Sequence, residues 1–350
     1  MKRIITCNDG TWNKLETDER TNVVKMYDCI CSMGKDADGN EVKQVKAYDE
    51  GVGTGYTLKN RIVGGATGAG IDRNIKDMYT FISFNYQPGD EIYLFGFSRG
   101  AYTARSLAGL IRNCGVLKPQ FFHLIDKAYD MYRQRNDYTT PDSDLMKSFR
   151  ANYSFEDITP IKFIGVWDTV GSLGIPLPSY KLLNQKKYKF HDVKLSSYVE
   201  HAYHALALDE KRALFQPTLW EKSETVKNDP NHPQKMEQRW FAGVHSNVGG
   251  GYKDCGLSNI ALDWLIKKAQ SAGLCYNDPP LIKETAYDKG IIINSYTPMY
   301  WLWRPSYREP FKKTDTNESI DESVFKRYDN DKAYRKAEVV DAWKKAEALS

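Results

Sequence analysis

A serine flanked by glycines stands where a predicted strand passes into a predicted helix. The segment Gly96-Phe97-Ser98-Arg99-Gly100 follows the apolar run Ile92–Phe95 and precedes a helical pattern that begins at Ala101. A sharp turn of this kind strains the serine backbone, which small neighbours make sterically possible, and it raises the hydroxyl above the sheet edge. The pattern predicts the nucleophile elbow of a serine hydrolase, with an ordinary strand-to-helix turn as the alternative interpretation.

A serine hydroxyl needs a neighbouring imidazole to accept its proton and a carboxylate to fix the imidazole tautomer. In α/β-hydrolases the order along the chain is serine, acid, histidine. His245 fits this order best because it follows the predicted strand Gln238–Val244 and precedes a glycine-rich loop. A glycine-flanked surface histidine is the alternative. The other histidines considered after the serine are His191, His201, His204 and His232. His201 and His204 are three residues apart, and we interpret them as lying on one face of a helix.

Asp168 is the carboxylate that we expect to orient this histidine. It follows the predicted strand Ile161–Val166 and should therefore project from the same sheet edge as the serine. Asp209 is the weaker choice because the charged segment around it is equally typical of a solvated or ion-paired helix end. Asp9 and Asp49 also end predicted strands, but they precede the serine and do not fit the expected order.

The charge that develops on the oxygen of a tetrahedral intermediate must be met by fixed hydrogen-bond donors. Arg99 provides the backbone amide that follows the nucleophile, and we expect Gly10 or Thr11, in the loop after the first strand, to provide a second. Asp9 is expected to orient that loop. A cation site formed by Asp9 and Asp49 is the alternative, although carboxylates at strand ends often serve as loop caps.

Two glycine-rich segments, Gly51–Gly55 and Gly64–Gly70, invite comparison with phosphate-binding loops. No lysine follows either segment in the P-loop pattern, and no G-x-G-x-x-G pattern follows a strand and opens its helix at the usual place. Gly51–Gly55 follows a predicted strand but leads to Tyr56-Thr57-Leu58-Lys59 and not to a helix start. We interpret them as a lid near the site, with Asp9, Trp12 and Gly53 as candidate substrate-contacting or lid residues. An ordinary surface loop is the alternative.

Composition excludes several classes of protein. The chain has 350 residues, of which 41% are hydrophobic and 27% charged, and its net charge is only +4, so no nucleic-acid partner is indicated. Its six cysteines form no C-x-x-C pair, and neither a metal nor a cofactor is predicted. Because no secretory signal or membrane-spanning run is visible, we expect a cytoplasmic protein whose export would use a signal-independent route.

Several segments repeat one pattern, an apolar run that ends in glycine or small polar residues and is followed by helical periodicity. The predicted strands are Arg3–Cys7, Lys43–Tyr48, Glu91–Phe95, Ile161–Val166 and Gln238–Val244. The clearest predicted helices are Gly70–Phe84, Ala101–Asn113, Gln120–Asn136 and Leu257–Ala272. This alternation predicts an α/β-hydrolase-like fold, with a mostly parallel central sheet flanked by helices and a site at the carboxyl ends of the strands.

We expect residues 1–350 to form a single α/β-hydrolase domain because no repeat and no low-complexity linker interrupts the sequence. Residues 172–237 are rich in proline and break the regular alternation, so we interpret much of this span as a cap or insertion near the site. The polar residues 329–350 are expected to form a helical tail.

Five motifs taken together resemble the uncharacterised α/β-hydrolase family that includes the first class of type VI secretion lipase effectors. The motifs are Asp9–Asn13, Gly51–Gly55, Gly96–Ala101, Trp167–Gly171 and Val244–Tyr252, and they span most of residues 1–270. The resemblance implies a triad of Ser98, Asp168 and His245. One difference is visible, since the second residue after the histidine is typically aspartate in this family and here is Asn247.

The resemblance also implies phospholipase activity on bacterial membranes, contact with a membrane surface, and partners in a secretion system or an immunity protein. The residues alone predict a serine ester hydrolase that acts on a lipid or another ester through an acyl-enzyme. Two alternatives stay open at this point. One is a soluble carboxylesterase, and the other is a non-catalytic module that binds a lipid or a partner on a hydrolase scaffold.

Overall fold

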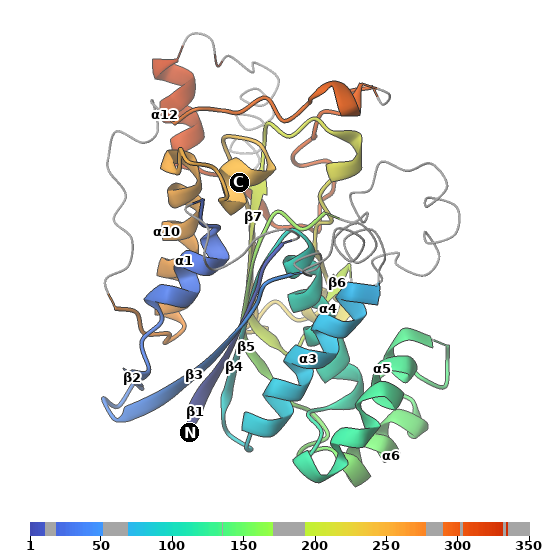
Figure 1. The fold of residues 1–350 in the computed structure, drawn as a ribbon. Coiled ribbons are helices and arrows are strands. Elements are labelled where there is room, and N and C mark those ends of the chain that lie inside the picture. Colours follow the sequence, from blue (N-terminus) through green and yellow to red (C-terminus); the bar gives the residue numbers. More distant parts are fainter. Residues whose placement is uncertain are drawn as a thin grey trace, which may run out of the picture.

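The structure is a computed structural model that describes residues 1–10, 19–51, 69–134, 136–170, 193–277, 290–301, 304–331 and 334. Within these residues, eight strands form one sheet in the order β10-β9-β7-β5-β4-β1-β3-β2 (Figure 1). Neighbouring strands are parallel except β2 and β3, which are antiparallel. The predicted α/β fold with a mostly parallel sheet is therefore confirmed.

The strands of this sheet are β1 (Lys2–Asn8), β2 (Met33–Lys35), β3 (Glu41–Asp49), β4 (Glu91–Phe97), β5 (Ile161–Trp167), β7 (Val199–Ala207), β9 (Lys235–Phe241) and β10 (Glu318–Ile320). A separate pair is formed by β6 (Lys194–Leu195) and β8 (Glu221–Lys222). The central strands β1, β4 and β5 are buried along almost their whole length. Strands covered on both faces have nearly continuous apolar sequences, which is why these three are easy to predict.

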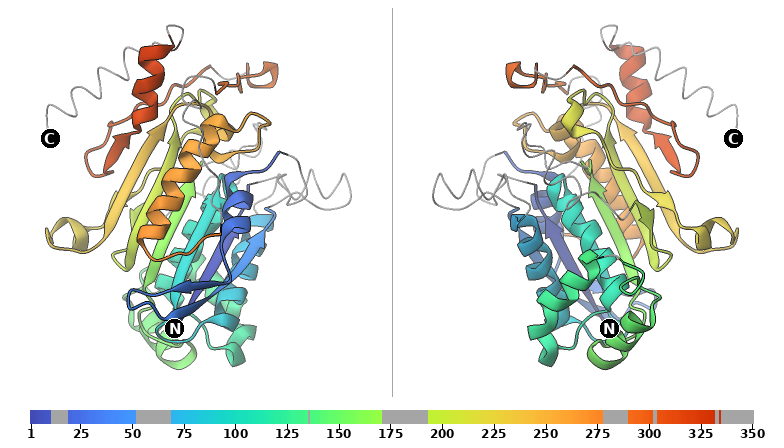
Figure 2. Two further views of the ribbon diagram at one scale, coloured as in Figure 1. Left: turned by 90° about the vertical axis from the view of Figure 1, so that its left-hand side faces the viewer. Right: turned by 90° about the vertical axis from the view of Figure 1, so that its right-hand side faces the viewer.

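Helices cover both faces of the sheet (Figure 2). On one face lie α1 (Asn22–Cys29) and α10 (Gly256–Ser271), and on the other lie α3 (Ala69–Asn85), α4 (Arg99–Cys114), α5 (Ile125–Gln134) and α6 (Asp144–Tyr153). The shorter helices are α8 (Glu224–Lys227), α9 (His245–Gly249), α12 (Glu322–Asn330), η1 (Pro119–Leu124), η2 (Ala213–Phe215) and η3 (Pro298–Tyr300). Each face of the sheet thus has its own apolar core.

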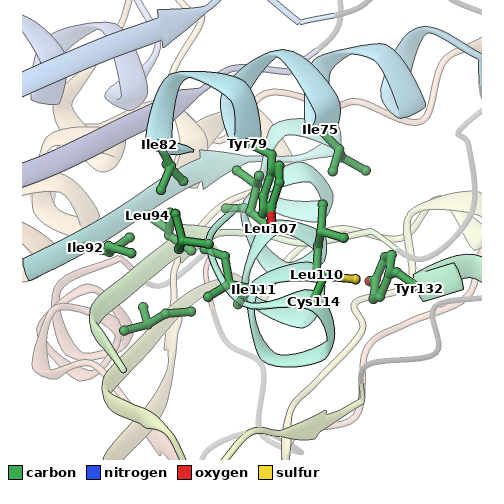
Figure 3. Packing of buried hydrophobic residues seen from close by; sticks show 14 of the residues in the cluster. Ile75, Tyr79, Ile82, Ile92, Leu94, Leu107, Leu110, Ile111, Cys114 and Tyr132 are labelled. Carbon is green, nitrogen blue, oxygen red and sulfur yellow. The ribbon is translucent and has the colours of Figure 1, made fainter. Parts of the chain in front are cut away.

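The core between α3 and α4 fixes the helix that carries the elbow (Figure 3). Tyr79 on α3 packs against this core beside Leu107 and Ile111 of α4, and all three are almost completely buried. The Tyr79 hydroxyl donates to the Gly115 carbonyl oxygen (2.7 Å) and accepts from the Leu117 amide (3.2 Å). Because both hydrogen-bonding functions of the buried phenol are satisfied, these bonds offset the cost of its desolvation and tie α3 to the end of α4.

All five predicted strands are present, although β9 begins three residues before the predicted Gln238. The four predicted helices correspond to α3, α4, the pair η1 and α5, and α10. The predicted tail at 329–350 lies almost entirely outside the described residues. What the structure describes in that region is the end of α12, which begins at Glu322, earlier than expected.

The interpretation of residues 172–237 as a cap is wrong for β7, which lies in the centre of the sheet between β5 and β9. His201 and His204 belong to this strand, so the helix expected there is also wrong. The sequence VEHAYHALA has neither a clean alternation nor a continuous apolar run, and this concealed a buried strand. Residues 171–192 lie outside the described residues.

Two glycines allow α4 to begin in close contact with β1 and β4. A Cβ atom on Gly96 would lie 2.2 Å from the Gly100 carbonyl oxygen, and one on Gly100 would lie 2.0 Å from the Asn8 carbonyl oxygen. Both partners are backbone atoms, which cannot turn aside as a side chain can. The first turn of α4 therefore rests on the carboxyl end of β1 and holds Ser98 at the sheet edge.

Replacement of Gly100 by alanine should lower the free energy of unfolding by about 2 kcal/mol or more, because the added methyl group forces backbone elements apart. Denaturant unfolding measures this loss. The matched control is Gly39→Ala, at a turn with a φ of 85° and no atom within 4 Å of the added Cβ. There we expect only the strain of a left-handed residue, about 1 kcal/mol. Equal losses in the two variants would contradict the close-contact explanation.

Candidate active site

Ser98 lies at the turn between β4 and α4 with a positive φ of 57° and a ψ of −117°. A non-glycine residue in this conformation is strained, as the predicted elbow requires. Its backbone N–H donates to the Trp167 carbonyl oxygen on β5 (3.0 Å), which ties the turn to the neighbouring strand. The Ser98 hydroxyl lies 2.8 Å from Nε2 of His245.

His245 is the first residue of α9, which follows β9 after a short turn. Its Nδ1 lies 2.5 Å from Oδ2 of Asp168. An ionised carboxylate can only accept, so Nδ1 carries the hydrogen and Nε2 is left as the acceptor for the Ser98 hydroxyl. Burial lowers the pKa of His245 and Asp168 opposes this effect, with a net shift downward. The neutral ring, the form that can accept a proton, is therefore favoured at pH 7.

Two aromatic rings hold the imidazole in place. Phe97 on β4 packs against the His245 ring with 4.7 Å between centroids, and Phe215 on η2 meets it edge-on at 5.1 Å. The guanidinium of Arg212 lies over the Phe215 ring, 3.5 Å from its centroid. These contacts restrict rotation of the imidazole and exclude water from its faces.

Asp168 follows β5 with a positive φ of 41° and is 0% exposed. Its Oδ1 accepts from the Ala207 backbone N–H at the end of β7 (3.0 Å) and from Nη1 of Arg308 (2.5 Å). Nη2 of Arg308 donates to Oδ2 (3.0 Å). Burial on its own would raise the pKa of the Asp168 carboxyl, but Arg308 and His245 outweigh burial and hold that pKa well below its usual range.

Four of the residues weighed in the sequence lie elsewhere or outside the described chain. His204 is fully buried and accepts from the Thr169 amide at Nε2 (3.0 Å), while its Nδ1 contacts Oε1 of Gln238 (3.1 Å). Burial lowers the pKa of His204 to about 3, so it is a neutral structural residue that supports the loop after Asp168. His201 and His232 are not brought to this hydrogen-bond chain. His191 lies outside the described residues.

The carboxylates of Asp209 and Glu210 accept hydrogen bonds from the backbone of the segment that carries His245. The Asp209 carboxylate accepts from the Gly243 amide (2.6 Å) and from the Tyr334 hydroxyl (3.0 Å). Glu210 is 1% exposed and accepts from the backbone N–H of His245 (3.2 Å). Its charge is balanced by Arg212 at 2.8 Å. Burial raises the pKa of Glu210, but the Arg212 hydrogen bonds outweigh it and bring the pKa to about 2.

Glu210, Arg212 and Arg308 carry no pattern in the sequence that predicts a role at this site. The first two follow β7, the strand that was not predicted, so their position beside the site was not visible. Arg308 lies among other polar residues of the C-terminal region, where a single arginine carries no pattern. A signal that could have been used is the charged sequence DEKR at 209–212, which directly follows an apolar run.

The loop after β1 is fixed by Asp9, which is 1% exposed. Its Oδ1 accepts from the Gly10 amide (2.6 Å), and its Oδ2 accepts from the hydroxyls of Thr21 (2.5 Å) and Tyr48 (2.9 Å). Asp9 thus has the bonds of a loop-orienting carboxylate. Within the described residues, no group of three or more histidine, cysteine or acidic side chains could hold a metal ion.

The Gly10 amide is engaged by Asp9, so of the two residues predicted to provide the second oxyanion donor this one is already satisfied. Thr11, the other, lies outside the described residues, as do the candidate lid residues Trp12 and Gly53. Arg99 begins α4 directly after the serine, which is the position that the elbow requires for the first donor.

A cavity of about 480 Å³ lies beside α4. Its described walls include Arg105, Tyr132, Leu195 and Trp220 and none of the three residues in the hydrogen-bond chain. Among the described residues, this cavity is therefore lined from α4 and its neighbours and not by Ser98, His245 or Asp168.

The family model described as "T6SS, Phospholipase effector Tle1-like, catalytic domain" matches residues 2–268. The chain belongs to this family. None of the described helices has both the length and the apolar composition that a bilayer-crossing helix needs.

Individual relatives of this Tle1-like chain are distant. The uncharacterized protein YEL023C of Saccharomyces cerevisiae is 30% identical over 234 residues, which are 61% of this chain and 32% of that protein. An uncharacterized protein from Pseudomonas aeruginosa aligns with a TM-score of 0.43 and 18% identity over 84% of this chain and 48% of that one. A Tle1 effector bound to the VgrG spike of the type 6 secretion system aligns with a TM-score of 0.38 and 18% identity over 73% and 52%. The chain thus spans about a third to a half of the length of these relatives.

Asn247, where the resemblance leads one to expect aspartate, is explained by its contacts in this Tle1-like chain. Its Oδ1 accepts from the amides of Val244 (3.2 Å) and Ile293 (3.3 Å), and its Nδ2 donates to the Ile291 carbonyl oxygen (3.0 Å). A carboxylate would accept the first two bonds but could not donate the third. The amide of Asn247 therefore links α9 to the C-terminal segment, whose described residues are 290–301 and 304–308.

Asp49, at the end of β3, should make the stability of the protein depend on pH. Burial raises the pKa of Asp49 from 3.8 to about 7, against the opposing bonds from Gly51 and Asn74. The folded state then binds more protons than the unfolded state, so the free energy of unfolding falls as pH rises from about 4 to about 7. Asp49→Asn removes this contribution, and its stability relative to the unmodified protein should increase across that range and then level off.

Denaturant unfolding at a series of pH values measures this difference. Glu50→Gln, at the exposed next residue, is the matched control, and its curve should follow that of the unmodified protein. Parallel curves for Asp49→Asn and the unmodified protein would contradict the expected role of the half-buried carboxyl.

Proposed function

We propose that this protein is a serine hydrolase that cleaves carboxylic ester bonds of phospholipids. The proposal rests above all on the unbroken hydrogen-bond chain from the Ser98 hydroxyl through His245 to the Asp168 carboxylate, with links of 2.8 and 2.5 Å. Membership of the Tle1-like phospholipase effector catalytic domain family supports the choice of substrate. Together they favour an acyl-transfer reaction on a lipid ester.

In the first half of the proposed reaction, Ser98 Oγ attacks the ester carbonyl carbon while its proton passes to Nε2 of His245. Asp168 accepts the hydrogen bond from the Nδ1–H group of His245 throughout and stabilises the imidazolium that forms. The tetrahedral intermediate collapses when the bond to the alcohol oxygen breaks, and Nε2 returns the proton to that oxygen. The products of this half are a free alcohol, which is a lysolipid, and an acyl group on Ser98.

In the second half, water replaces the serine as nucleophile. Nε2 of His245 takes a proton from the water as its oxygen attacks the acyl carbon, and then gives this proton to Ser98 Oγ as the acyl bond breaks. A fatty acid leaves and the hydroxyl is restored. We assign the first oxyanion donor to the Arg99 amide and the second to Thr11, the remaining residue of the predicted pair.

The described residues 290–301 and 304–308 support contact with a lipid surface. Trp301 and Tyr307 are exposed by 67% and 65%. Tyr300 in the same segment packs against Phe215, 6.2 Å between centroids, and Phe215 in turn contacts the imidazole of the site. The segment lies at the end of the sheet where the parallel strands finish (Figure 1). Tryptophan and tyrosine are favoured at the boundary between lipid headgroups and hydrocarbon, so we assign this segment to the membrane surface.

Partners follow from the family in the same way. A Tle1 effector has been seen bound to a VgrG spike. We include delivery by a type VI secretion system, and neutralisation by an immunity protein, in the proposal. Co-purification of the full chain with a spike protein tests the first of these.

Replacement of Ser98 by alanine should lower hydrolysis by about 10⁴-fold or more, because the group that forms the acyl bond is lost. Mixed phospholipid vesicles are incubated with each protein, and mass spectrometry identifies the released fatty acids and lysolipids. Ser271→Ala, at the exposed end of α10, is the matched control and should keep full activity. Full activity in Ser98→Ala would rule out the mechanism.

Labelling with a fluorophosphonate separates the alternatives if the unmodified protein releases no lipid product. A labelled Ser98 without lipid hydrolysis would identify an esterase with another substrate. A serine that resists labelling would favour a non-catalytic binding module.

The exposed aromatic residues should matter for vesicles and not for soluble esters. Removal of Trp301 and Tyr307 as a double alanine variant takes away apolar area worth about 1.5–3 kcal/mol per side chain when buried. We therefore expect the vesicle concentration at half-maximal rate to rise about tenfold or more, with the rate on a soluble short-chain ester unchanged. Tyr138→Ala, 77% exposed between α5 and α6, is the control. Equal loss on both substrates would contradict a role in membrane contact.

A further inference from the structure

The carboxylate of Asp168 accepts a hydrogen bond at every lone-pair position it has. His245 Nδ1 and Arg308 Nη2 donate to Oδ2, at 2.5 and 3.0 Å. The Ala207 amide and Arg308 Nη1 donate to Oδ1, at 3.0 and 2.5 Å. A carboxylate offers about four such positions. Arg308 alone therefore supplies half of the bonds that fix the plane of this carboxylate.

Arg308 is itself held in one orientation. Its side chain is 0% exposed. Nη1 also donates to the Ala207 carbonyl oxygen (2.6 Å), and Nη2 also donates to the carbonyl oxygen of Phe215. These two carbonyl groups fix the plane of the guanidinium, so that it meets Asp168 as a bidentate fork. A lysine could supply the charge at this place but not the fork.

We propose that Arg308 is a positioning residue of the hydrolase, which orients Asp168 toward His245 and sets the proton affinity of the Asp168–His245 pair. The inference rests on the proposed function. Arg308 lies beyond residues 2–268, which the family model matches, so it comes from a part of the chain outside that match. It acts through Asp168 and does not contact the reacting bond.

The charged groups around the imidazole determine how Arg308 affects the protonation of His245. Asp168 after β5 and the pair Glu210 and Arg212 after β7 act on His245 directly. Arg308 acts on the carboxylate behind the ring and offsets its negative charge. With Arg308 present, the buried negative charge of Asp168 is paired with one buried positive charge. Proton uptake by His245 is thus held back, and the ring stays neutral and ready to accept the serine proton.

Removal of Arg308 takes one buried positive charge away from two groups that share a proton. Groups so close titrate as a pair, and the loss of a nearby cation raises the affinity of the pair for a proton. His245 would then stay protonated to a higher pH and could not act as a base there. The carboxylate would also lose two of its four bonds and could rotate away from Nδ1.

The test measures the rate at which a fluorophosphonate labels Ser98 in the full chain between about pH 4 and pH 9. The rate reports activation of the serine and needs no lipid. Arg308→Met keeps most of the side-chain volume and removes the charge. We expect its rate at pH 7 to fall about 10- to 100-fold, the scale of loss when a catalytic group moves by about 1 Å. The acid limb of its pH profile should move upward by about one unit.

Two further variants make the result specific. Arg304→Met places the same change on an exposed residue of the same segment and should leave rate and profile unchanged. Arg308→Lys keeps the charge without the fork, so its rate should fall while its acid limb stays in place. An unchanged acid limb in Arg308→Met would overturn the proposal. If that variant does not fold, an unreduced rate in Arg308→Lys would overturn it.

Proton NMR keeps this inference separate from the proposed function. The hydrogen between Asp168 and His245 should give a strongly deshielded signal in the Ser98→Ala protein, which cannot react. Adding Arg308→Met to that protein should shift or abolish the signal, and an unchanged signal would count against Arg308 as a positioning residue. Failure of the unmodified protein to label would refute the hydrolase, while the NMR result would still decide the role of Arg308.

Discussion

A fully buried carboxylate is the constraint on which the site depends. Asp168 is 0% exposed, and an ion in such a place must be stabilised by charge and hydrogen bonds or it takes up a proton. Arg308 and the Ala207 amide meet this need, and the pKa of the carboxyl stays well below its usual range although burial acts to raise it. An ionised Asp168 holds the hydrogen on Nδ1 of His245 and so leaves Nε2 facing Ser98.

The strand order explains how groups so distant in the sequence meet. β7 lies beside β5 with Ala205 opposite Trp167. The next residue after Trp167 is Asp168, and its carboxylate accepts from the amide of Ala207, two residues after Ala205. β9 follows β7 in the sheet and delivers α9 to the same edge. The buried His204 on β7 then supports the loop after Asp168 through the Thr169 amide. The strand β7 therefore places the carboxylate of Asp168, and His204 on this strand has a structural role.

The sequence predicted most of the sheet and the three residues of the hydrogen-bond chain because each of these residues follows an apolar run that marks a buried strand. It did not predict β7, whose polar residues interrupt both of the usual strand patterns. The position of Glu210, which follows β7, could not be predicted for the same reason. Arg308 could not be predicted because its role depends on a contact across 140 residues, which no local pattern encodes.

The contacts that hold the hydrogen-bond chain extend beyond the region that the family model matches. Residues 2–268 contain the hydrogen-bond chain, but the C-terminal segment supplies Arg308 to Asp168 and Ser295 to Glu210. Asn247 joins α9 to the same segment through Ile291 and Ile293. These contacts hold Asp168 and the helix α9, which carries His245. A segment without a strand-end motif of its own therefore supplies the positive charge that stabilises the buried carboxylate. The C-terminal segment is thus part of the site and not an appendage to it.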